Sequence, residues 1–453
     1  MSRSGQKRSE RCMLCLKIKF EIGRRIVGRM VKDLALIVVA SSVVIAGGYK
    51  IPEQSLNSMA LGAAYVAHTT GADTNYYNPA NMSFMDESKS YVEGGLTLAH
   101  LPENVYSYGP LSGESEVEDL PIPFFHYVAK PIGDFRWGVS MVAPGGLTKR
   151  WETPSIFQKA SAEEFTLKVI ELNPSMSYKI SDNLSIGAGL RLIYSEGVVK
   201  SDSTEANAVP SSPIPYAISR DMEGDTFEFG YNLALAYKPT SDINLAVTYR
   251  SNIDLTEEGT ATLSYDGTVD PEYGADVTVP LPAALNIAIS KTWNDKFTLE
   301  FNYERTYWSE YETLDFNYDR AIDDNPYRDV LIGAFDLPKA KNWKDTDTFR
   351  LGATIKMDNK ITAMMGFAID ETPAPVETLG FELPDSDAKI FSMGFRYQQT
   401  ENLSWGAAFL YDSKESISLV PGAHDDSTSL LNAGGSFHEG GAYLTTVGIA
   451  YEY

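Results

Sequence analysis

The feature of this sequence that most constrains its fold is a strict alternation of apolar and polar residues. Over residues 227–237, phenylalanine, tyrosine and leucine fall on one face of an extended chain, and glutamate, glycine, asparagine and alanine fall on the other. The same alternation recurs in residues 184–194, 243–249, 297–303, 349–357, 361–369, 391–397, 403–411 and 443–453. Alternation sustained over about ten residues is typical of a transmembrane β-strand, whose outer face meets lipid.

A soluble antiparallel sandwich also alternates, so the composition of the two faces has to decide between the two folds. The polar face consists of Gly, Ala, Ser, Asn and charged residues, which are too small and too polar for a dry core. The strands are also longer than the roughly five or six residues usual in soluble sheets. Aromatic residues stand at the ends of the apolar face, as in interfacial girdles: Trp137, Tyr178, Tyr237, Tyr397 and Trp405. The sequence therefore predicts an all-β transmembrane barrel.

The connections between the strands alternate between short and long. Six short turns lie at 133–134, 181–183, 240–242, 294–295, 358–359 and 400–402. Seven long polar loops lie at 101–120, 147–164, 196–225, 256–276, 310–347, 371–387 and 413–439. These connections imply 14 antiparallel strands, and the barrel must close because lipid cannot satisfy an open sheet edge. Short turns on the periplasmic side and long loops outside are the bacterial pattern.

The first 46 residues differ in composition from the rest. They hold ten of the 38 basic residues but only three of the 61 acidic ones, in a chain whose net charge is −23. An uncharged, mostly apolar run from Leu34 to Ile45 follows the basic region and ends before Ala46. This order is typical of a secretory signal peptide, and the run is shorter than the about 20 residues of a spanning helix. Residues 1–46 are predicted to be removed, with translation starting at Met1 or Met30, and Cys12 and Cys15 leave with them.

The last strand carries a second export signal. The chain ends on the aromatic Tyr453, with Tyr451 two positions before it and Gly448 at the sixth position from the end. This pattern resembles the β-signal that the barrel-assembly machinery reads on a terminal strand. An ordinary edge strand that ends on Tyr is the alternative. We expect the outer membrane of a Gram-negative bacterium as the location, and the assembly machinery and outer-membrane lipid as partners.

Residues 47–87, between the signal and the first strand, do not alternate. They are rich in Gly, Ala and Asn and include Asn78-Pro79-Ala80. A barrel of 14 strands encloses a lumen wider than wall side chains can fill. We therefore predict that residues 47–87 form a hatch, or plug, inside a barrel of residues 88–453.

Several segments together resemble the FadL/TodX-type outer-membrane transporters of long-chain fatty acids and hydrocarbons. The resemblance covers residues 47–453 and rests on the order of the segments rather than on one motif. In the N-terminal part they are 46–49, 58–65 and 77–80, and in the strands they are 144–147, 249–251, 281–282, 370–375 and 383–385. The resemblance implies that an apolar ligand is caught among the outer loops, passes to a pocket above the hatch and leaves sideways through a gap in the wall. It also implies a monomer.

The predicted gap lies at Pro144-Gly145-Gly146, which the resemblance places at the end of the third strand, where that family has a kink. Proline removes a donor from the β-ladder and glycine permits unusual backbone angles, so the wall is expected to open or bulge there. A simple strand end is the alternative.

Two outer loops are candidates for ligand capture. One holds Trp151, Ile156 and Phe157, whose spacing suggests a short amphipathic helix, and the other holds Ile214 and Tyr216. Apolar residues on the outer loops of an acidic protein could form a landing patch. Packing of loop on loop is the equally supported alternative.

Four arginines are predicted to point into the lumen, where they would face Glu228, Glu300 and Glu304: Arg191, Arg250, Arg350 and Arg396. A guanidinium could hold the carboxylate head of a fatty acid in a two-pronged contact. A network of internal ion pairs is the favoured alternative. If all four are satisfied internally, a neutral hydrocarbon becomes as good a ligand as a fatty acid.

Other functional classes find little support. Five scattered histidines show no HExxH spacing, and GxSxG, P-loop and GxGxxG motifs are absent. A pI near 4.6 argues against a nucleic-acid binder. We expect no enzymatic activity, no cofactor and no bound metal. A general diffusion porin, which would lack the hatch, and a surface adhesin or structural barrel, which would need no lumen ligand, remain as alternatives.

Overall fold

The computed structural model describes residues 47–453. The predicted signal peptide, with Cys12 and Cys15, lies outside the described residues. Within them, no helix combines the length and the apolar character needed to cross a bilayer.

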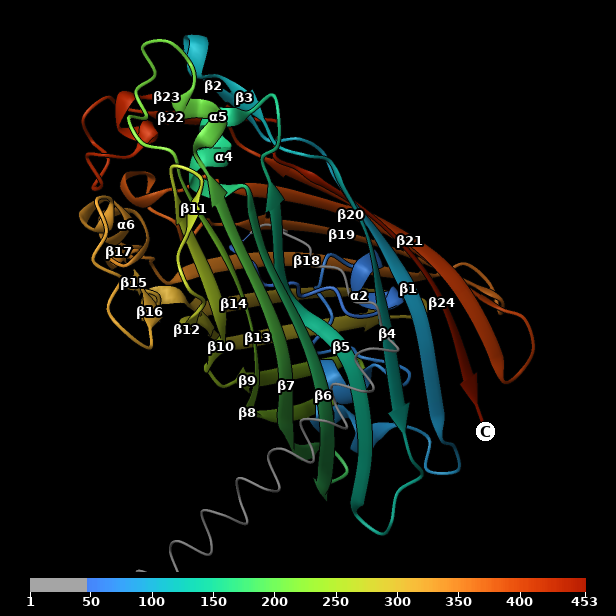
Figure 1. Cartoon of the computed structure of the whole chain (residues 1–453). Helices are drawn as coiled ribbons and strands as arrows, with labels where there is room; N and C mark the ends of the chain where they lie inside the picture. The colour runs from blue at the N-terminus through green and yellow to red at the C-terminus, as the bar shows by residue number, and fades with distance from the viewer. Residues whose placement is uncertain (1–46) are drawn as a thin grey trace, which may run out of the picture. The chain divides into compact units, whose positions relative to one another are not determined.

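Fourteen antiparallel strands form a closed barrel (Figure 1), which confirms the predicted fold class. The strands of the ring, in order, are β1 (Tyr91–Leu101), β4 (Glu118–Val128), β5 (Phe135–Arg150), β6 (Glu164–Ser181), β7 (Leu184–Asp202), β8 (Ile218–Thr240), β9 (Ile243–Arg250), β13 (Ala283–Trp293), β14 (Phe297–Tyr307), β18 (Thr346–Lys356), β19 (Ile361–Asp370), β20 (Ala388–Gln398), β21 (Leu403–Lys414) and β24 (Ala442–Glu452). The last strand pairs with the first, from Tyr91 opposite Glu452 to His100 opposite Tyr443. The ring therefore has no free terminal strand, as lipid requires.

Strand β8 shows how the alternation maps onto the wall. Its outward residues Leu233 and Leu235 are 50% and 40% exposed, whereas the inward residues Asn232 and Ala236 are 2% and 1% exposed. Because these inward residues are hardly exposed to solvent, another part of the chain must cover them inside the barrel. The outward aromatic residues Trp137, Tyr178, Tyr237 and Trp405 are exposed, as the predicted interfacial girdle requires.

The hatch fills the lumen. Its helices are α2 (Leu56–Ala60), α3 (Thr74–Tyr77) and the 3-10 helix η1 (Pro79–Phe84), and Figure 1 shows α2 enclosed by the strands. Helix α2 packs against β19, β20, β21 and β24, and η1 packs against β5 to β8. The small inward residues make this contact possible. A β-carbon at Gly366 would lie 2.1 Å from the Leu61 carbonyl carbon, and one at Gly187 would lie 2.5 Å from the Ala80 nitrogen.

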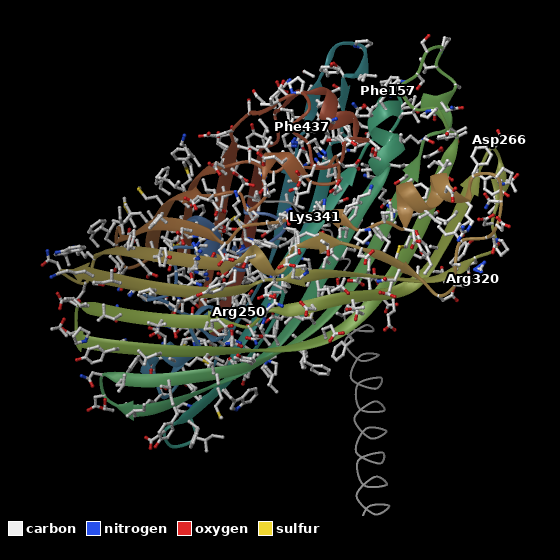
Figure 2. All side chains as sticks on the ribbon, turned by 90° about the vertical axis from the view of Figure 1, so that its left-hand side faces the viewer. Phe157, Arg250, Asp266, Arg320, Lys341 and Phe437 are labelled. Carbon is white, nitrogen blue, oxygen red and sulfur yellow. The ribbon has the colours of Figure 1, made fainter. Side chains whose placement is uncertain are left out.

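The long connections build a head on one end of the barrel (Figure 1). Strands β10 (Ile253–Tyr265), β12 (Tyr273–Leu281) and β16 (Phe316–Tyr318) extend the wall beyond β8. A small sheet of β2 (Val105–Ser107), β3 (Gly113–Glu114), β22 (Ile417–Leu419) and β23 (Gly435–His438) lies beside helices α4 (Ile156–Ala162) and α5 (Thr204–Asn207). Helix α6 (Arg328–Phe335) packs on residues of β10, β12 and β16. The shortest elements are β11 (Thr268–Val269), β15 (Thr313–Leu314), β17 (Lys339–Ala340), η2 (Gly109–Leu111), η3 (Trp308–Glu310), η4 (Val376–Thr378) and η5 (Leu430–Ala433). In Figure 2 the labelled Phe157, Asp266 and Phe437 lie in this head.

Candidate functional site

The wall of the barrel is incomplete between β4 and β5. These strands pair only over Phe125–Val128 opposite Gly138–Met141, although β4 pairs with β1 along its whole length, from Glu118 to Val128. The loop-side half of β4 therefore has no β5 partner. Pro144, Gly145 and Gly146 lie on the separated part of β5, where the register with β6 shifts between Val142 and Gly145.

The expectation that β5 ends at this point is wrong. The strand continues through Gly146 to Arg150, because it pairs with β6 along one edge as far as Glu164, and the hatch supplies a partner on the edge that β4 leaves free. The Ile51 amide donates to the Pro144 carbonyl at 2.9 Å, and the Gly146 amide donates to the Tyr49 carbonyl at 2.8 Å. The segment Tyr49–Ile51 thus acts as a short strand against β5.

The side chain of Gln54 adds two contacts to the same edge. Its amide donates to the Ala143 carbonyl at 2.7 Å, and its carbonyl oxygen accepts from the Ala143 amide at 2.9 Å. Residues 49–54 of the hatch therefore satisfy the backbone groups that the gap would leave unpaired.

Tyr49 separates two cavities inside the barrel. The Tyr49 hydroxyl donates to the Pro280 carbonyl, and its ring meets Trp308 edge-on with centroids 4.9 Å apart. One cavity includes Val279, before this contact on β12, and the other includes Ala284, after it on β13. Since β12 descends from the head, the first cavity lies on the loop side of Tyr49.

The loop-side cavity is almost entirely apolar. It is lined by Tyr49, Leu147, Phe165, Leu167, Val279, Tyr311, Lys341, Trp343, Ala374, Thr378, Leu379, Gly380, Glu382 and Leu383. The two charged residues, Lys341 and Glu382, form an ion pair with each other. The lining is therefore an apolar surface on which no charge is left unpaired.

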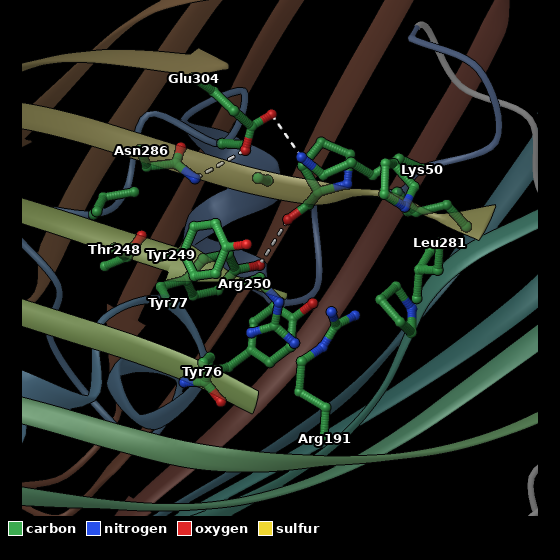
Figure 3. A pocket seen from close by; sticks show the side chains of 18 of the residues that line it. Lys50, Tyr76, Tyr77, Arg191, Thr248, Tyr249, Arg250, Leu281, Asn286 and Glu304 are labelled. Atoms are coloured by element: carbon green, nitrogen blue, oxygen red, sulfur yellow. Dashed lines mark hydrogen bonds and ion pairs between the residues drawn. The ribbon is translucent and has the colours of Figure 1, made fainter. Parts of the chain in front are cut away.

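The second, polar cavity lies against the hatch, and charged side chains stand among the apolar residues of its lining. Figure 3 shows Lys50, Asn286 and Glu304 on one side and Arg191, Arg250 and Tyr76 on the other. Lys50 binds Glu304 at 2.8 Å, and burial lowers the pKa of Lys50 while the Glu304 carboxylate opposes that shift. Pro79 of the hatch and Pro144 of the gap both line this cavity.

All four predicted lumen arginines have carboxylate partners inside the chain. Arg350 binds Glu304 at 3.2 Å, as expected. Arg191 binds Glu171 at 3.1 Å, and Arg250 binds the same carboxylate. Arg396 binds Glu93 at 2.9 Å and the side-chain oxygen of Asn57 at 2.9 Å. Reasoning from the sequence missed Glu171 and Glu93, which lie on inward faces of β6 and β1.

The hatch motif Asn78-Pro79-Ala80 holds the hatch together. The side-chain amide of Asn78 donates to the Val66 carbonyl at 2.9 Å, and Pro79 begins η1. The Ala80 carbonyl accepts from the Ser185 hydroxyl on the wall at 2.7 Å. Of these residues, only Pro79 reaches the polar cavity.

The five predicted capture residues do not form one patch. Trp151 is fully buried and donates through its indole nitrogen to the Phe381 carbonyl at 2.8 Å. Ile156 and Phe157 begin α4, which confirms the expected helix, but Phe157 is only 9% exposed. Tyr216 is 44% exposed and packs on Tyr327. Ile214 is half-buried, and its carbonyl accepts from Asn207.

The C-terminal residues lie at the seam of the barrel. The Tyr453 amide donates to the Ser90 carbonyl at 3.0 Å, and the Ser90 amide donates to the Tyr453 carbonyl at 2.8 Å. Tyr451 and Tyr453 face outward, and a β-carbon at Gly448 would lie 3.2 Å from Leu56 of the hatch. Within residues 47–453, no group of three or more His, Asp or Glu side chains is placed to hold a metal ion.

Known proteins share this architecture. The family model described as outer membrane protein transport protein (OMPP1/FadL/TodX) matches residues 37–453. The long-chain fatty acid transport protein of Escherichia coli O6:H1 is 24% identical over 372 residues, which are 73% of this chain and 78% of that protein. Outer membrane protein P1 of Haemophilus influenzae is 24% identical over 371 residues, which are 72% of this chain and 77% of that protein.

Solved structures with the same fold include two from pseudomonads. The crystal structure of a Pseudomonas aeruginosa FadL homologue aligns with a TM-score of 0.72 and 20% identity, covering 90% of this chain and 99% of that chain. The crystal structure of the Pseudomonas putida toluene transporter TodX aligns with a TM-score of 0.67 and 17% identity, covering 89% of this chain and 98% of that chain.

Proposed function

Because the chain belongs to the family of outer membrane protein transport proteins (OMPP1/FadL/TodX), we propose that it carries hydrophobic small molecules inward and releases them sideways into the bilayer. Its location is the outer membrane of a Gram-negative bacterium, where its relatives act. The family consists of transport proteins rather than enzymes.

The proposed route uses the two cavities in sequence. A ligand gathered by the head, with Trp151, Ile156, Phe157, Ile214 and Tyr216 as capture candidates, enters the apolar cavity. It passes Tyr49 into the polar cavity, which Pro144 lines, and leaves between β4 and β5. The observation that carries the proposal is the short β4–β5 ladder, with the hatch covering the freed edge of β5 at Ala143–Gly146. Lateral release keeps the ligand out of water, which is worth about 0.8 kcal/mol per CH₂ group.

We propose that the apolar body of the ligand, and not a charged head, is what the protein recognises. The E. coli relative is named a long-chain fatty acid transport protein and the TodX structure a toluene transporter. In this chain the four lumen arginines are already bound to carboxylates, so a ligand carboxylate would have to displace one of them. Uncharged hydrocarbons meet no such competition.

The remaining elements of the proposal concern biogenesis. Residues 1–46 are the signal peptide, residues 47–87 the hatch and residues 88–453 the barrel. The strand end at Gly448, Tyr451 and Tyr453 is read by the barrel-assembly machinery, and the protein acts as a monomer.

A reversible lock tests the exit. Lys50 and Gly145 are antiparallel bridge partners, and such pairs have Cα atoms about 4.5–5.5 Å apart, within the range of a disulfide. The double variant Lys50→Cys/Gly145→Cys should form a disulfide that fastens the hatch over the gap. No other cysteine remains once residues 1–46 are removed. We expect uptake of labelled alkane and oleate by cells to fall at least about tenfold in the oxidised variant.

The same cells treated with a reductant provide the internal control. Uptake should return to the level of the single variant Lys50→Cys, which reports any cost of losing the ion pair with Glu304. Unchanged uptake with the disulfide intact, at equal surface expression, would refute exit between β4 and β5. If the reduced cells take up alkane but not oleate, the ligand is an uncharged hydrocarbon rather than a fatty acid.

A further inference from the structure

The start of the hatch is tightly enclosed. Gly47 and Gly48 adopt φ angles of +80° and +77°. A β-carbon at Gly48 would lie 2.8 Å from the Trp308 ring and 2.9 Å from the Trp343 ring. A β-carbon at Gly47 would lie 2.9 Å from Oδ2 of Asp370. The α-carbon of Gly47 therefore sits directly beside a buried carboxylate.

The surroundings of Gly47 contain more carboxylates than cations. Asp370 is 5% exposed, and among residues 47–453 it forms no ion pair; its Oδ1 accepts from the Thr348 hydroxyl at 2.6 Å. Three cations whose charge acts on Asp370 are committed to other carboxylates: Lys50 and Arg350 bind Glu304, and Lys414 binds Asp385.

Glu53 is a second buried carboxyl group that no cation binds among residues 47–453. It is 3% exposed, and neither of its oxygens has a hydrogen-bond partner within the described chain. Burial raises the pKa of Glu53 to about 7. A buried carboxyl group of this kind favours the arrival of a positive charge nearby.

We propose that the missing cation is the α-ammonium group of Gly47, which forms when the bond between Ala46 and Gly47 is cut and which then pairs with Asp370 inside the lumen. Hydrolysis of that amide by water leaves the carboxylate on Ala46 and the protonated amine on Gly47, so processing places a charge where the precursor has a neutral amide. The inference rests on the proposed removal of residues 1–46 and is independent of the ligand.

The ion pair would anchor the segment that covers the gap. Only one residue separates Gly47 from Tyr49, whose carbonyl accepts from Gly146 of β5. The Gly48 amide donates to Oδ2 of Asp385 at 3.2 Å, which fixes the same stretch from the other side. Asp370 is in this view a positioning residue, and cleavage of the signal peptide completes the plug.

Titration of the terminal amine tests the pair directly. The purified mature protein would be labelled by reductive methylation with ¹³C-formaldehyde, and the resonance of the terminal glycine would be followed by NMR as a function of pH. We expect the pKa of this amine to be lower by about 1 or more in Asp370→Asn, because an adjacent carboxylate stabilises the ammonium form. Asp266→Asn, at the exposed tip of the head, is the control and should titrate like the wild type.

A second variant keeps Asp370 and moves the amine. One alanine inserted between Ala46 and Gly47 displaces the ammonium by about 3.8 Å. Hydrogen exchange at the Ile51 and Gly146 amides should become about tenfold faster, as in Asp370→Asn. Equal titration in the wild type and Asp370→Asn, or N-terminal sequencing that finds a terminus other than Gly47, would overturn the inference. Neither measurement involves transport, so a failure of the proposed function is seen separately.

Discussion

Individual charged residues fasten the hatch to the wall across large separations in the sequence. The Glu300 carboxylate of β14 accepts hydrogen bonds from the backbone amides of Val66, Ala67 and His68 at 2.5, 2.8 and 2.7 Å. One carboxylate thus satisfies three consecutive donors that have no helix or sheet to bond with. Such charge-assisted bonds are among the stronger hydrogen bonds in proteins.

Replacement of Glu300 should loosen the hatch and spare the barrel. In Glu300→Ala the three amides lose their acceptor, and each charged bond is worth about 1.5–3 kcal/mol. We expect hydrogen exchange at Val66, Ala67 and His68 to rise by at least about a hundredfold, while heat-modifiable migration stays normal. The exposed Glu310→Gln is the control. Wild-type protection in Glu300→Ala would mean that these amides are held by other groups.

Asp73 gives the hatch a predictable response to pH. It accepts from Tyr65 at 3.1 Å and Asn57 at 3.2 Å. Burial, and then the neighbouring Glu93, raise the pKa of Asp73 well above its usual range, against the opposing effect of Arg396. The folded state therefore holds a proton that the unfolded chain releases above about pH 4. Stability from this group is present at low pH and is lost as the pH rises.

The expected consequence is that Asp73→Asn stabilises the protein more at pH 7 than at pH 5. The difference should be about 3 kcal/mol, since both pH values lie between the two pKa values and each pH unit there is worth about 1.4 kcal/mol. Thermal unfolding of the detergent-solubilised protein at the two pH values measures it, with the exposed turn variant Asp134→Asn alongside. A difference in stability between Asp73→Asn and the wild type that does not change with pH would contradict the raised pKa of Asp73.

At the scale of elements, the barrel depends on one seam. Strand β24 pairs with β21 on one side and β1 on the other, and the exchange of bonds between Ser90 and Tyr453 extends that ladder by one residue. The rings of Tyr451 and Tyr453 are stacked with centroids 6.0 Å apart on the outer face. The terminal residue thus serves both closure and the lipid-facing surface.

Deletion of Tyr453 should impair assembly more than transport. It removes two backbone bonds at the seam, worth about 1–3 kcal/mol together, and leaves donors and acceptors unpaired near lipid. The heat-modifiable fraction at the cell surface should fall, while uptake per folded molecule stays constant. Tyr453→Phe keeps the ring and the backbone and should assemble normally. Normal surface levels of the deletion variant would refute this role.

At the scale of the whole molecule, the backbone ladders that close the ring run between wall strands and do not pass through the hatch. Each strand of the ring bonds to its neighbours, and the hatch attaches mainly through side chains and the short ladder at β5. Deletion of residues 48–87 should therefore leave a folded barrel with a water-filled lumen, since 14 strands enclose more space than side chains can fill.

Swelling of proteoliposomes in arabinose would measure that opening. The deletion variant should admit the sugar and the wild type should not. Proteoliposomes of the variant that remain tight although the protein is folded would show that the wall residues close the lumen alone. Rapid entry of arabinose through the wild type would instead favour a general diffusion porin.

The sequence alone determined the class of fold, because a strand in lipid must alternate and a barrel in lipid must close. The turn between Asn294 and Asp295 and its five counterparts could be located from local chemistry, and the strand count followed. The spacing of residues within one segment also predicts the helix that begins at Ile156 and the outward aromatic girdle. Even the hatch could be expected, from the width of the lumen and the absence of alternation before Tyr91.

Only the tertiary structure decided which groups meet. Glu300 lies opposite Val66 across 234 positions of the chain, and periodicity shows that a residue faces inward without showing what it faces. For the same reason Arg191 and Arg250 could not be matched to Glu171, nor Arg396 to Glu93, from the pattern of their strands. Pro144 indicated a defect in the wall but not its cover. There β5 continues because it pairs with β6 on one edge, while the backbone of Tyr49–Ile51, about 95 positions earlier in the chain, covers the other edge.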